Sequence, residues 1–338
     1  MDTIQIANIL LTRRCNLRCD YCSIVRNYQN MPEGYPKIEY YKDHELTVNQ
    51  WYEIIDRLAL NNPNIFLIFY GGEPFLYDGL TDLIKYCHKK NLHYTIISNN
   101  TEEIQPRIRK LYNFVGQIKG FSASVDPELC LHLDNEDIRV HRVIKTIAGF
   151  ENLRQLKKEG IAIDVVAEIT VSSQNCRYLY DTVRILSEAG IYSSITTIDL
   201  KQNVFYDFST ITDRSWLVDK DAEIANQFMK IMSDESLLVH IPQMLIMLYG
   251  ILPCNMKCKI YEDVHNVCVD ADGSFRLCLR IRGIETPKLK LNNVIDKNGK
   301  IQSVASLSMK YDYDEFCQGC NHTCLLFSKY FVKGIVEH

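Results

Sequence analysis

Three cysteines near the start of the chain are the residues whose spacing points most directly to chemistry. Cys15, Cys19 and Cys22 lie within the eight residues CNLRCDYC. A structural zinc site or a fully protein-ligated iron–sulfur cluster takes four protein ligands, so three thiolates leave one metal position open to an outside molecule. The three thiols could hold three irons of a four-iron cluster, and zinc with a distant fourth ligand is the structural alternative.

The composition describes an ordinary globular protein of about two domains. The 338 residues are 46% hydrophobic and 24% charged, with a net charge of -4, which gives no general attraction to nucleic acid. The N-terminus does not have the pattern of a secretory signal. The apolar stretch 237–252 is interrupted by His240, Pro242 and Gln243 and is too short for a membrane span. We therefore expect a cytoplasmic protein without membrane contact.

Thirteen cysteines are many for a reducing compartment, where thiols serve metals or catalysis more often than cross-links. Ten of them fall in two groups, at 15–22 and at 254–324. We expect the scattered Cys87, Cys130 and Cys176 to be small buried side chains. No chemistry is assigned to Cys87.

Alternating apolar runs and helical patterns indicate an α/β fold up to about residue 200. Helical spacing is seen at 51–60, 80–88, 143–156 and 179–189, and Thr47 with Gln50 has the form of a capping box. The pattern predicts a parallel sheet buried on both faces and curled into a partial (β/α)6 TIM-like barrel. The expected strands are 4–11, 64–70, 94–98, 119–125, 161–171 and 193–200.

The expected organisation has three parts. Residues 1–205 form the partial barrel, 206–250 a helical connection, and 251–338 a cysteine-rich C-terminal domain. Functional residues of such barrels lie where the parallel strands end. Cys15 directly follows the first expected strand, which places the thiols at that edge.

Several further segments follow strands in the same order as motifs of one known family. The C-x3-C-x-aromatic-C spacing, YGGEPFL (70–76), SNNT (98–101) and SASVD (122–126) together resemble radical S-adenosylmethionine (SAM) enzymes over about residues 4–200. The resemblance implies a [4Fe-4S] cluster on Cys15, Cys19 and Cys22. The fourth iron would chelate the amino and carboxylate groups of SAM.

The resemblance also implies roles for residues around the cofactor. It places Tyr21 near the adenine, and it assigns the GGEP motif to the methionine end of SAM. There Gly71 and Gly72 would allow close backbone approach, while Glu73 and backbone carbonyls would meet the ammonium; a solvated loop carboxylate is the alternative for Glu73. The other implied cofactor-binding residues are Pro74, the turn residues Ser98 and Asn99, and the ribose candidates Ser124, Asp126 and Glu168.

The reaction implied by the resemblance is a reductive one. An external one-electron reductant of the flavodoxin or ferredoxin type would supply the electron that cleaves SAM to methionine and a 5′-deoxyadenosyl radical. That radical would take a hydrogen atom from the substrate. Cys130 and Cys176 follow strand ends and are weak candidates for returning a hydrogen atom to a substrate radical; a packing role is the alternative.

The second cysteine group resembles the SPASM and Twitch extensions, which hold auxiliary iron–sulfur clusters. The family's C-x2-C-x5-C is here C-x2-C-x3-C, and no cysteine follows Cys324. We expect at least one auxiliary [4Fe-4S] cluster; seven thiols fully ligate only one, which favours a single cluster, and a second would have an open iron. Cys268, expected in a hairpin strand, is the least suitable ligand, and a zinc ribbon is the alternative. The expected ligands are drawn from Cys254, Cys258, Cys278, Cys317, Cys320 and Cys324.

The sequence says least about the substrate. The resemblance favours a ribosomally made peptide or protein, modified by cross-linking, epimerisation or oxidation. Only fourteen residues precede Cys15, so we expect a separate peptide-recognition protein or direct reading of the substrate. The same chemistry on a sugar, an aminoglycoside, a nucleotide or RNA is one alternative, and a non-catalytic zinc scaffold is another.

Overall fold

The computed structural model describes residues 3–17, 19, 43–126, 140–172, 175–197, 222–239, 266–276 and 294–301. Each of the six expected strands is present there, shifted at its ends by two residues or fewer; 198–200 lie outside the described residues. The strands are β1 (Ile6–Leu10), β2 (Phe66–Tyr70), β3 (His93–Ser98), β4 (Ile118–Val125), β5 (Ala162–Val171) and β6 (Tyr192–Thr197).

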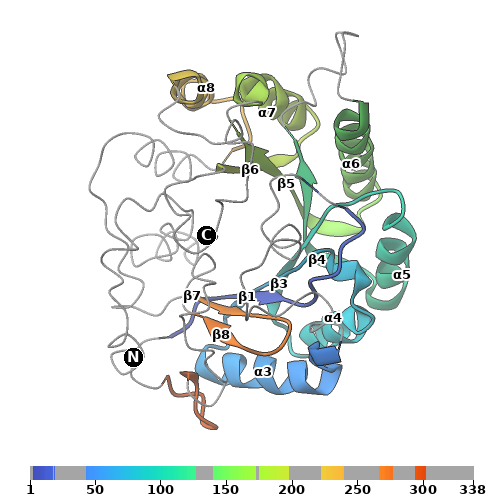
Figure 1. Cartoon of the computed structure of the whole chain (residues 1–338), viewed down its shortest axis with the longest axis vertical. Helices are drawn as coiled ribbons and strands as arrows, with labels where there is room; N and C mark the ends of the chain where they lie inside the picture. The colour runs from blue at the N-terminus through green and yellow to red at the C-terminus, as the bar shows by residue number, and fades with distance from the viewer. Residues whose placement is uncertain are drawn as a thin grey trace, which may run out of the picture.

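Helices connect these strands and cover one face of the sheet (Figure 1). The four expected helices are confirmed, and a fifth, α5, stands between β3 and β4. Thr47 and Gln50 form the expected capping box at the start of the first one. The helices are α3 (Val48–Asn61), α4 (Leu80–Lys89), α5 (Gln105–Val115), α6 (Val140–Lys158), α7 (Leu179–Glu188) and α8 (Ala222–Met232), with short 3-10 turns η1 (Pro74–Leu76) and η3 (Cys176–Tyr178).

The six strands are parallel and run in the order β6-β5-β4-β3-β2-β1, which is the predicted half-barrel. The sheet continues beyond β1 in a way that the sequence did not predict. Strand β7 (Asn266–Val269) pairs parallel with β1, and β8 (Phe275–Arg276) pairs antiparallel with β7. A hairpin from the cysteine-rich part of the sequence thus extends the sheet at the strand that leads to Cys15.

The two faces of the strands differ in chemistry because side chains alternate along a strand. Phe121, Ala123 and Val125 of β4 lie on the helix-covered face, in the main hydrophobic core. Ser122 and Ser124 alternate with them and therefore lie on the opposite, inner face. The prediction of two buried faces holds for the helix side and for Ser122 on the inner face; the inner face of β4 is polar and suits a polar ligand.

Cys87 and Cys268 lie where they were expected. Cys87 is fully buried in the hydrophobic core, where desolvation raises the pKa of its thiol to about 12. Cys268 lies in β7, opposite Arg276 of β8. Within the described residues, no helix is long and apolar enough to cross a bilayer.

Candidate functional site

The segment that carries Cys15 begins as a continuation of the β1–β2 ladder. Leu11 N donates to Tyr70 O (2.9 Å), and Gly72 N donates to Thr12 O (2.8 Å). Glu73 N then donates to Arg14 O (2.8 Å). These bonds fasten the first residues of the cysteine loop (residues 12–19) to the GGE sequence, which confirms that the two motifs lie side by side.

Gly71 and Gly72 are required by the close approach of this loop. A Cβ atom at Gly71 would lie 2.4 Å from Thr12 O, and one at Gly72 would lie 2.3 Å from Arg14 O. Both contacts are with backbone atoms, which cannot move aside as a side chain does. The glycines therefore make room for the protein's own cysteine loop; their approach to a cofactor stays a prediction.

Glu73 is an internal anchor and not a solvated loop carboxylate, because its side chain is fully buried. Its oxygens accept hydrogen bonds from Ser98 Oγ (3.0 and 3.1 Å), Asn99 N (2.8 Å) and Phe75 N (3.1 Å). Burial raises the pKa of Glu73 to about 7, and the hydrogen bonds from Asn99, Phe75 and Ser98 oppose that rise. Glu73 therefore ties the end of β2 to the turn after β3. Contact between its carboxylate and an ammonium group stays a prediction.

Asn99 connects that turn to the cysteine loop. Its Nδ2 donates to Asn16 Oδ1 (2.8 Å) and lies 3.8 Å from Cys15 Sγ. The same sulfur accepts from Leu17 N at 3.4 Å. Cys15 and Cys19 are both partly exposed and form no disulfide, which is compatible with a role as metal ligands.

Glu45 provides a further support for the loop that the sequence did not reveal. Its carboxylate accepts hydrogen bonds from Thr12 Oγ1 and from Arg14 Nη2, the latter at 3.0 Å. Glu45 lies just before α3, far from the cysteines in sequence. Neither a local pattern nor a motif could have identified this contact.

Two of the three predicted ribose-binding residues, Ser124 and Glu168, share one row across the inner face, and Asp126 lies beyond the end of β4. In the strand register Ser124 lies opposite Glu168, and Glu168 lies opposite Ser194. Adjacent strands are about 4.8 Å apart, so the row extends roughly 10 Å from β4 to β6. Ser124 and Glu168 are therefore close enough to bind one ligand together.

Glu168 is held in place by hydroxyl groups on both neighbouring strands. Its side chain accepts hydrogen bonds from Ser194 and Ser122. Desolvation raises the pKa of Glu168, and these two bonds lower it. Ser122 Oγ in turn lies 3.4 Å from Thr95 Oγ1. The result is a chain of polar groups from β3 to β6, in which Ser194 lies outside the motifs and Ser122 belongs to SASVD but was not among the predicted site residues.

Other predicted site residues have mixed outcomes. Pro74 opens η1 and is buried, and Asp126 is buried at the end of β4. Cys176 is buried in the hydrophobic core, which favours packing over hydrogen-atom donation. Several predicted residues lie outside the described part of the chain: Tyr21, Cys22, Cys130, Cys254, Cys258, Cys278, Cys317, Cys320 and Cys324. Among the described residues no three metal-binding side chains come together, as expected when Cys22 is not among them.

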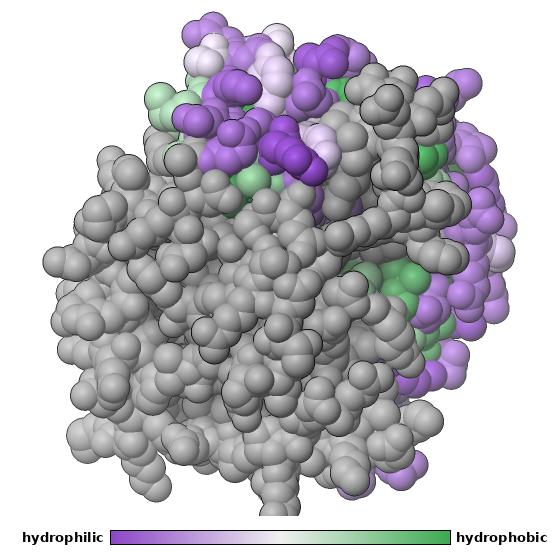
Figure 2. All heavy atoms as spheres, turned by 45° about the horizontal axis from the view of Figure 1, so that its top comes forward, coloured by the Kyte–Doolittle hydropathy of each residue, from purple (hydrophilic) through white to green (hydrophobic). Residues whose placement is uncertain are grey.

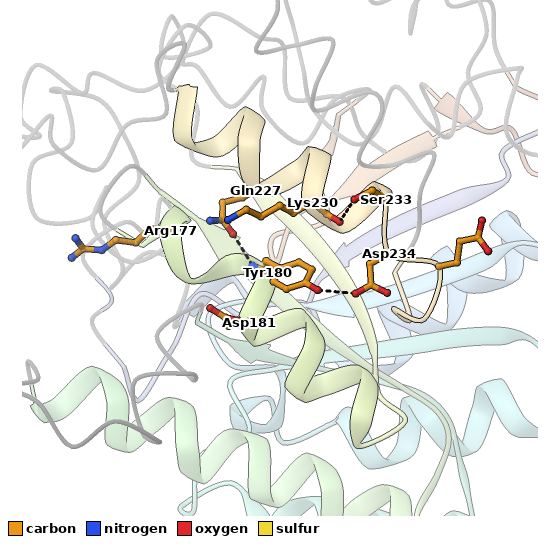
Figure 3. A pocket seen from close by; sticks show the side chains of 8 residues that line it. Arg177, Tyr180, Asp181, Gln227, Lys230, Ser233 and Asp234 are labelled. Carbon is orange, nitrogen blue, oxygen red and sulfur yellow. Dashed lines mark hydrogen bonds between the residues drawn. The ribbon is translucent and has the colours of Figure 1, made fainter.

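A hollow of about 830 Å³ lies elsewhere, between α7 and α8. Its lining groups largely bond to one another: Tyr180 Oη donates to Asp234 Oδ2 (2.8 Å), and Tyr180 N donates to Gln227 Oε1 (3.0 Å) (Figure 3). The described surface of α7 and α8 is mainly hydrophilic (Figure 2). The helices α7 and α8 lie at the β6 end of the sheet, so this hollow is separate from the cysteine loop at β1.

Comparison with known proteins identifies the family. The model of the radical SAM superfamily matches residues 9–203. This region contains Cys15, Cys19 and Cys22, the end of β1, and the strands β2 to β6. The chain belongs to the radical SAM superfamily, a family of enzymes.

Curated relatives are similar only over parts of their length. An S-adenosylmethionine-dependent nucleotide dehydratase of Selenomonas ruminantium is 27% identical over 101 residues, which are 30% of this chain and 32% of the relative. The Fe-coproporphyrin III synthase of Methanosarcina barkeri is 28% identical over 181 residues, or 54% of this chain and 40% of the relative. The matches therefore span well under half of either relative.

Solved structures support the fold. SuiB of Streptococcus suis with bound S-adenosylmethionine superposes with a TM-score of 0.57 at 12% identity, covering 91% of this chain and 66% of SuiB. Native anSMEcpe with bound AdoMet gives 0.56 at 15% identity, covering 92% and 88%. At such identities the likeness is one of fold alone.

Proposed function

We propose that this protein reductively cleaves SAM and uses the resulting radical to take a hydrogen atom from a peptide or protein substrate. The observation that carries the proposal is the packing of the cysteine loop against Gly72 and Asn99 at the edge of the sheet. This packing brings a thiol from the first motif and the turns after β2 and β3 to one place. The polar row on the inner face begins beside it.

The residues present fit a SAM-bound iron–sulfur cluster. Cys15 and Cys19 offer accessible thiols, and Cys22, from the same motif, would be the third ligand. When bound, the cluster and SAM supply the reductive cleavage that yields the deoxyadenosyl radical. The chain's own part is to hold the loop through Gly72, to orient it through Asn99, and to bind ribose hydroxyls with Ser124 and Glu168.

A peptide substrate is supported by two structural neighbours. SuiB has been crystallised with its precursor peptide SuiA, and that structure gives a TM-score of 0.57 at 13% identity. The anSMEcpe structure with AdoMet and the Kp18Cys peptide gives 0.54 at 17% identity. We further propose an auxiliary [4Fe-4S] cluster in 251–338, an external one-electron reductant, and a separate recognition protein or direct reading of the peptide. Zinc in the C-terminal cysteines is the alternative.

A nucleotide or sugar substrate is the second candidate. It is favoured by the nucleotide dehydratase among the relatives and by the hydroxyl-rich inner face, where Ser122, Ser124 and Ser194 surround Glu168. Some of these groups would be taken up by SAM itself, which leaves fewer for a second hydroxylated ligand.

The test is anaerobic reconstitution with iron and sulfide, followed by dithionite and SAM and chromatography for 5′-deoxyadenosine. Cys19→Ala should abolish the product, whereas Cys87→Ala, a matched loss of a thiol from the hydrophobic core, should retain it. A wild-type protein with a full cluster that forms no 5′-deoxyadenosine would refute the proposal.

The substrate class is tested by deuterium transfer. Fully deuterated peptide digests and deuterated sugar or nucleotide pools are supplied separately, and the 5′-deoxyadenosine is analysed by mass spectrometry. The proposal predicts deuterium from the peptide pool. Deuterium arriving only from the sugar or nucleotide pool would establish the second candidate instead.

A further inference from the structure

The hairpin of β7 and β8 comes from the sequence between Cys258 and Cys278, yet it packs against the strand that precedes Cys15. Four β7 residues pair with β1, from Ile6 opposite Asn266 to Ile9 opposite Val269. Asn8 Nδ2 donates to Asn266 Oδ1 (2.7 Å) between two buried side chains. Leu46 N also donates to Ala271 O (2.8 Å) in the hairpin turn.

A buried ion pair joins the end of this hairpin strand to the cysteine loop. Arg13 Nε donates to Asp270 Oδ1 (3.0 Å), and Arg13 Nη2 pairs with Asp270 Oδ2. Both side chains are only 5% exposed. Asp270 Oδ1 also accepts from Ala271 N (2.8 Å), which fixes the carboxylate relative to its own turn. Such a two-point contact sets both distance and orientation.

The position of Arg13 makes this pair relevant to the site. Arg13 is two residues before Cys15, and its carbonyl oxygen lies 2.8 Å from where a Cβ of Gly72 would stand. A displacement of Arg13 would therefore move both the thiol and the glycine turn. A buried ion pair does not in itself add stability over well-packed apolar residues, so a positioning role explains its presence better than stability does.

We propose that Asp270, acting through Arg13, is a positioning residue that sets the cysteine loop for cofactor binding. The C-terminal hairpin is then part of the N-terminal site, and the two cysteine-containing parts of the chain are mechanically coupled. This inference rests on the proposed function for its effect on SAM. Its structural effect can be measured without any cofactor.

Three variants of the full chain test the proposal. Asp270→Asn breaks the charge pair and leaves Arg13 buried. The double variant Arg13→Met with Asp270→Leu replaces the pair by apolar side chains of similar size, which can preserve stability. Arg109→Gln is the control, since it removes an arginine of α5 from an exposed pair with Glu159, which follows the last residue of α6; the two side chains are 43% and 36% exposed.

Two readouts separate positioning from stability. Hydrogen exchange of the apoprotein reports the Gly72 and Glu73 amides, which donate to Thr12 O and Arg14 O. Equilibrium binding to the reconstituted protein measures the affinity of the site for SAM. We expect exchange at these amides to be about tenfold faster in both pair variants. SAM affinity should fall about tenfold in both, even where the double variant melts at the wild-type temperature, while Arg109→Gln changes neither.

Unchanged exchange and unchanged SAM affinity in the double variant would overturn the inference. If the stability of that double variant is also that of the wild type, the ion pair has a structural role only. If the wild-type protein binds no SAM, the proposed function fails, while the exchange result still decides whether Asp270 holds the loop.

Discussion

Asn99 donates a 2.8 Å hydrogen bond to Asn16, which joins the turn after β3 to the middle of the cysteine loop. The same amide nitrogen lies 3.8 Å from Cys15 Sγ. One side chain thus contacts both Asn16 in the loop and the sulfur of Cys15, a predicted cluster ligand. Glu73 accepts a hydrogen bond from Asn99 N in this turn, and Gly72 N donates one to Thr12 O in the loop.

Replacing Asn99 by alanine should weaken SAM binding more than it weakens the fold. The lost hydrogen bonds are worth about 1 kcal/mol each in stability, but the loop would lose its link to β3. We expect SAM affinity to fall several-fold in equilibrium binding, with a small decrease in melting temperature. Asn64→Ala, on the exposed turn before β2, is the control. Equal SAM affinity in Asn99→Ala and wild type would rule out this role.

Gly72→Ala should be strongly destabilising because the new Cβ would lie 2.3 Å from Arg14 O. We expect a loss of about 1–3 kcal/mol in the free energy of unfolding, together with a lower iron content after reconstitution. Gly149→Ala is the matched control, since in α6 its Cβ would make only an ordinary 3.5 Å contact with Ser124 O. Helix propensity predicts that this control is neutral or slightly stabilising. Denaturant unfolding of the apoproteins gives the comparison.

Glu73 should make stability decrease as the pH rises. Its pKa is about 7 in the folded protein against 4.5 in the unfolded chain, so between these values the folded state binds more protons. Folding stability from this group is therefore highest below about pH 4.5 and falls by about 3 kcal/mol as the pH rises to 7. Glu73→Gln lacks this titration.

The check is the difference in unfolding free energy between wild type and Glu73→Gln across that pH range. The wild type should lose stability relative to the variant as the pH rises. A difference that grows in favour of the wild type would mean that the hydrogen bonds from Asn99, Phe75 and Ser98 outweigh desolvation.

Glu168→Gln should lower SAM affinity by roughly tenfold, the cost of exchanging a charged acceptor for a neutral one at a ligand hydroxyl. The free energy of unfolding should fall little. The carboxylate of Glu168 is desolvated in the folded protein, and a neutral amide does not have the desolvation cost of a charge. Glu159→Gln, whose charge is at the surface, should bind SAM normally. A Glu168→Gln protein with unaltered SAM affinity would remove this residue from the ribose site.

The sequence was sufficient for the half-barrel because its signals are local. Apolar runs such as 64–70 and the capping box of Thr47 and Gln50 fix strands and a helix start without distant information. The motif residues that the structure describes also occur along the strands in the expected order. The alternation in SASVD places Ser122 and Ser124 on the face opposite the apolar residues, which is the polar inner face of a sheet that was expected to be buried on both faces.

The contacts between distant segments could not be predicted. Strand β7 has only four residues, and its pairing with β1 joins positions about 260 residues apart. The bonds of Arg13 to Asp270 and of Arg14 to Glu45 depend on that packing and leave no pattern in the sequence. Glu73 was expected to meet a ligand, but burial and the donors around it show that it is first an internal anchor.

The most direct test of the central claim is electron–nuclear double resonance of the reduced, reconstituted protein with SAM carrying ¹⁵N in its amino group. We expect a ¹⁵N coupling that shows the amino nitrogen bound to one iron of the cluster, and its loss in Cys19→Ala but not in Cys87→Ala. A cluster that forms fully yet shows no coupling to the labelled nitrogen, or a site that contains zinc in place of iron, would contradict it.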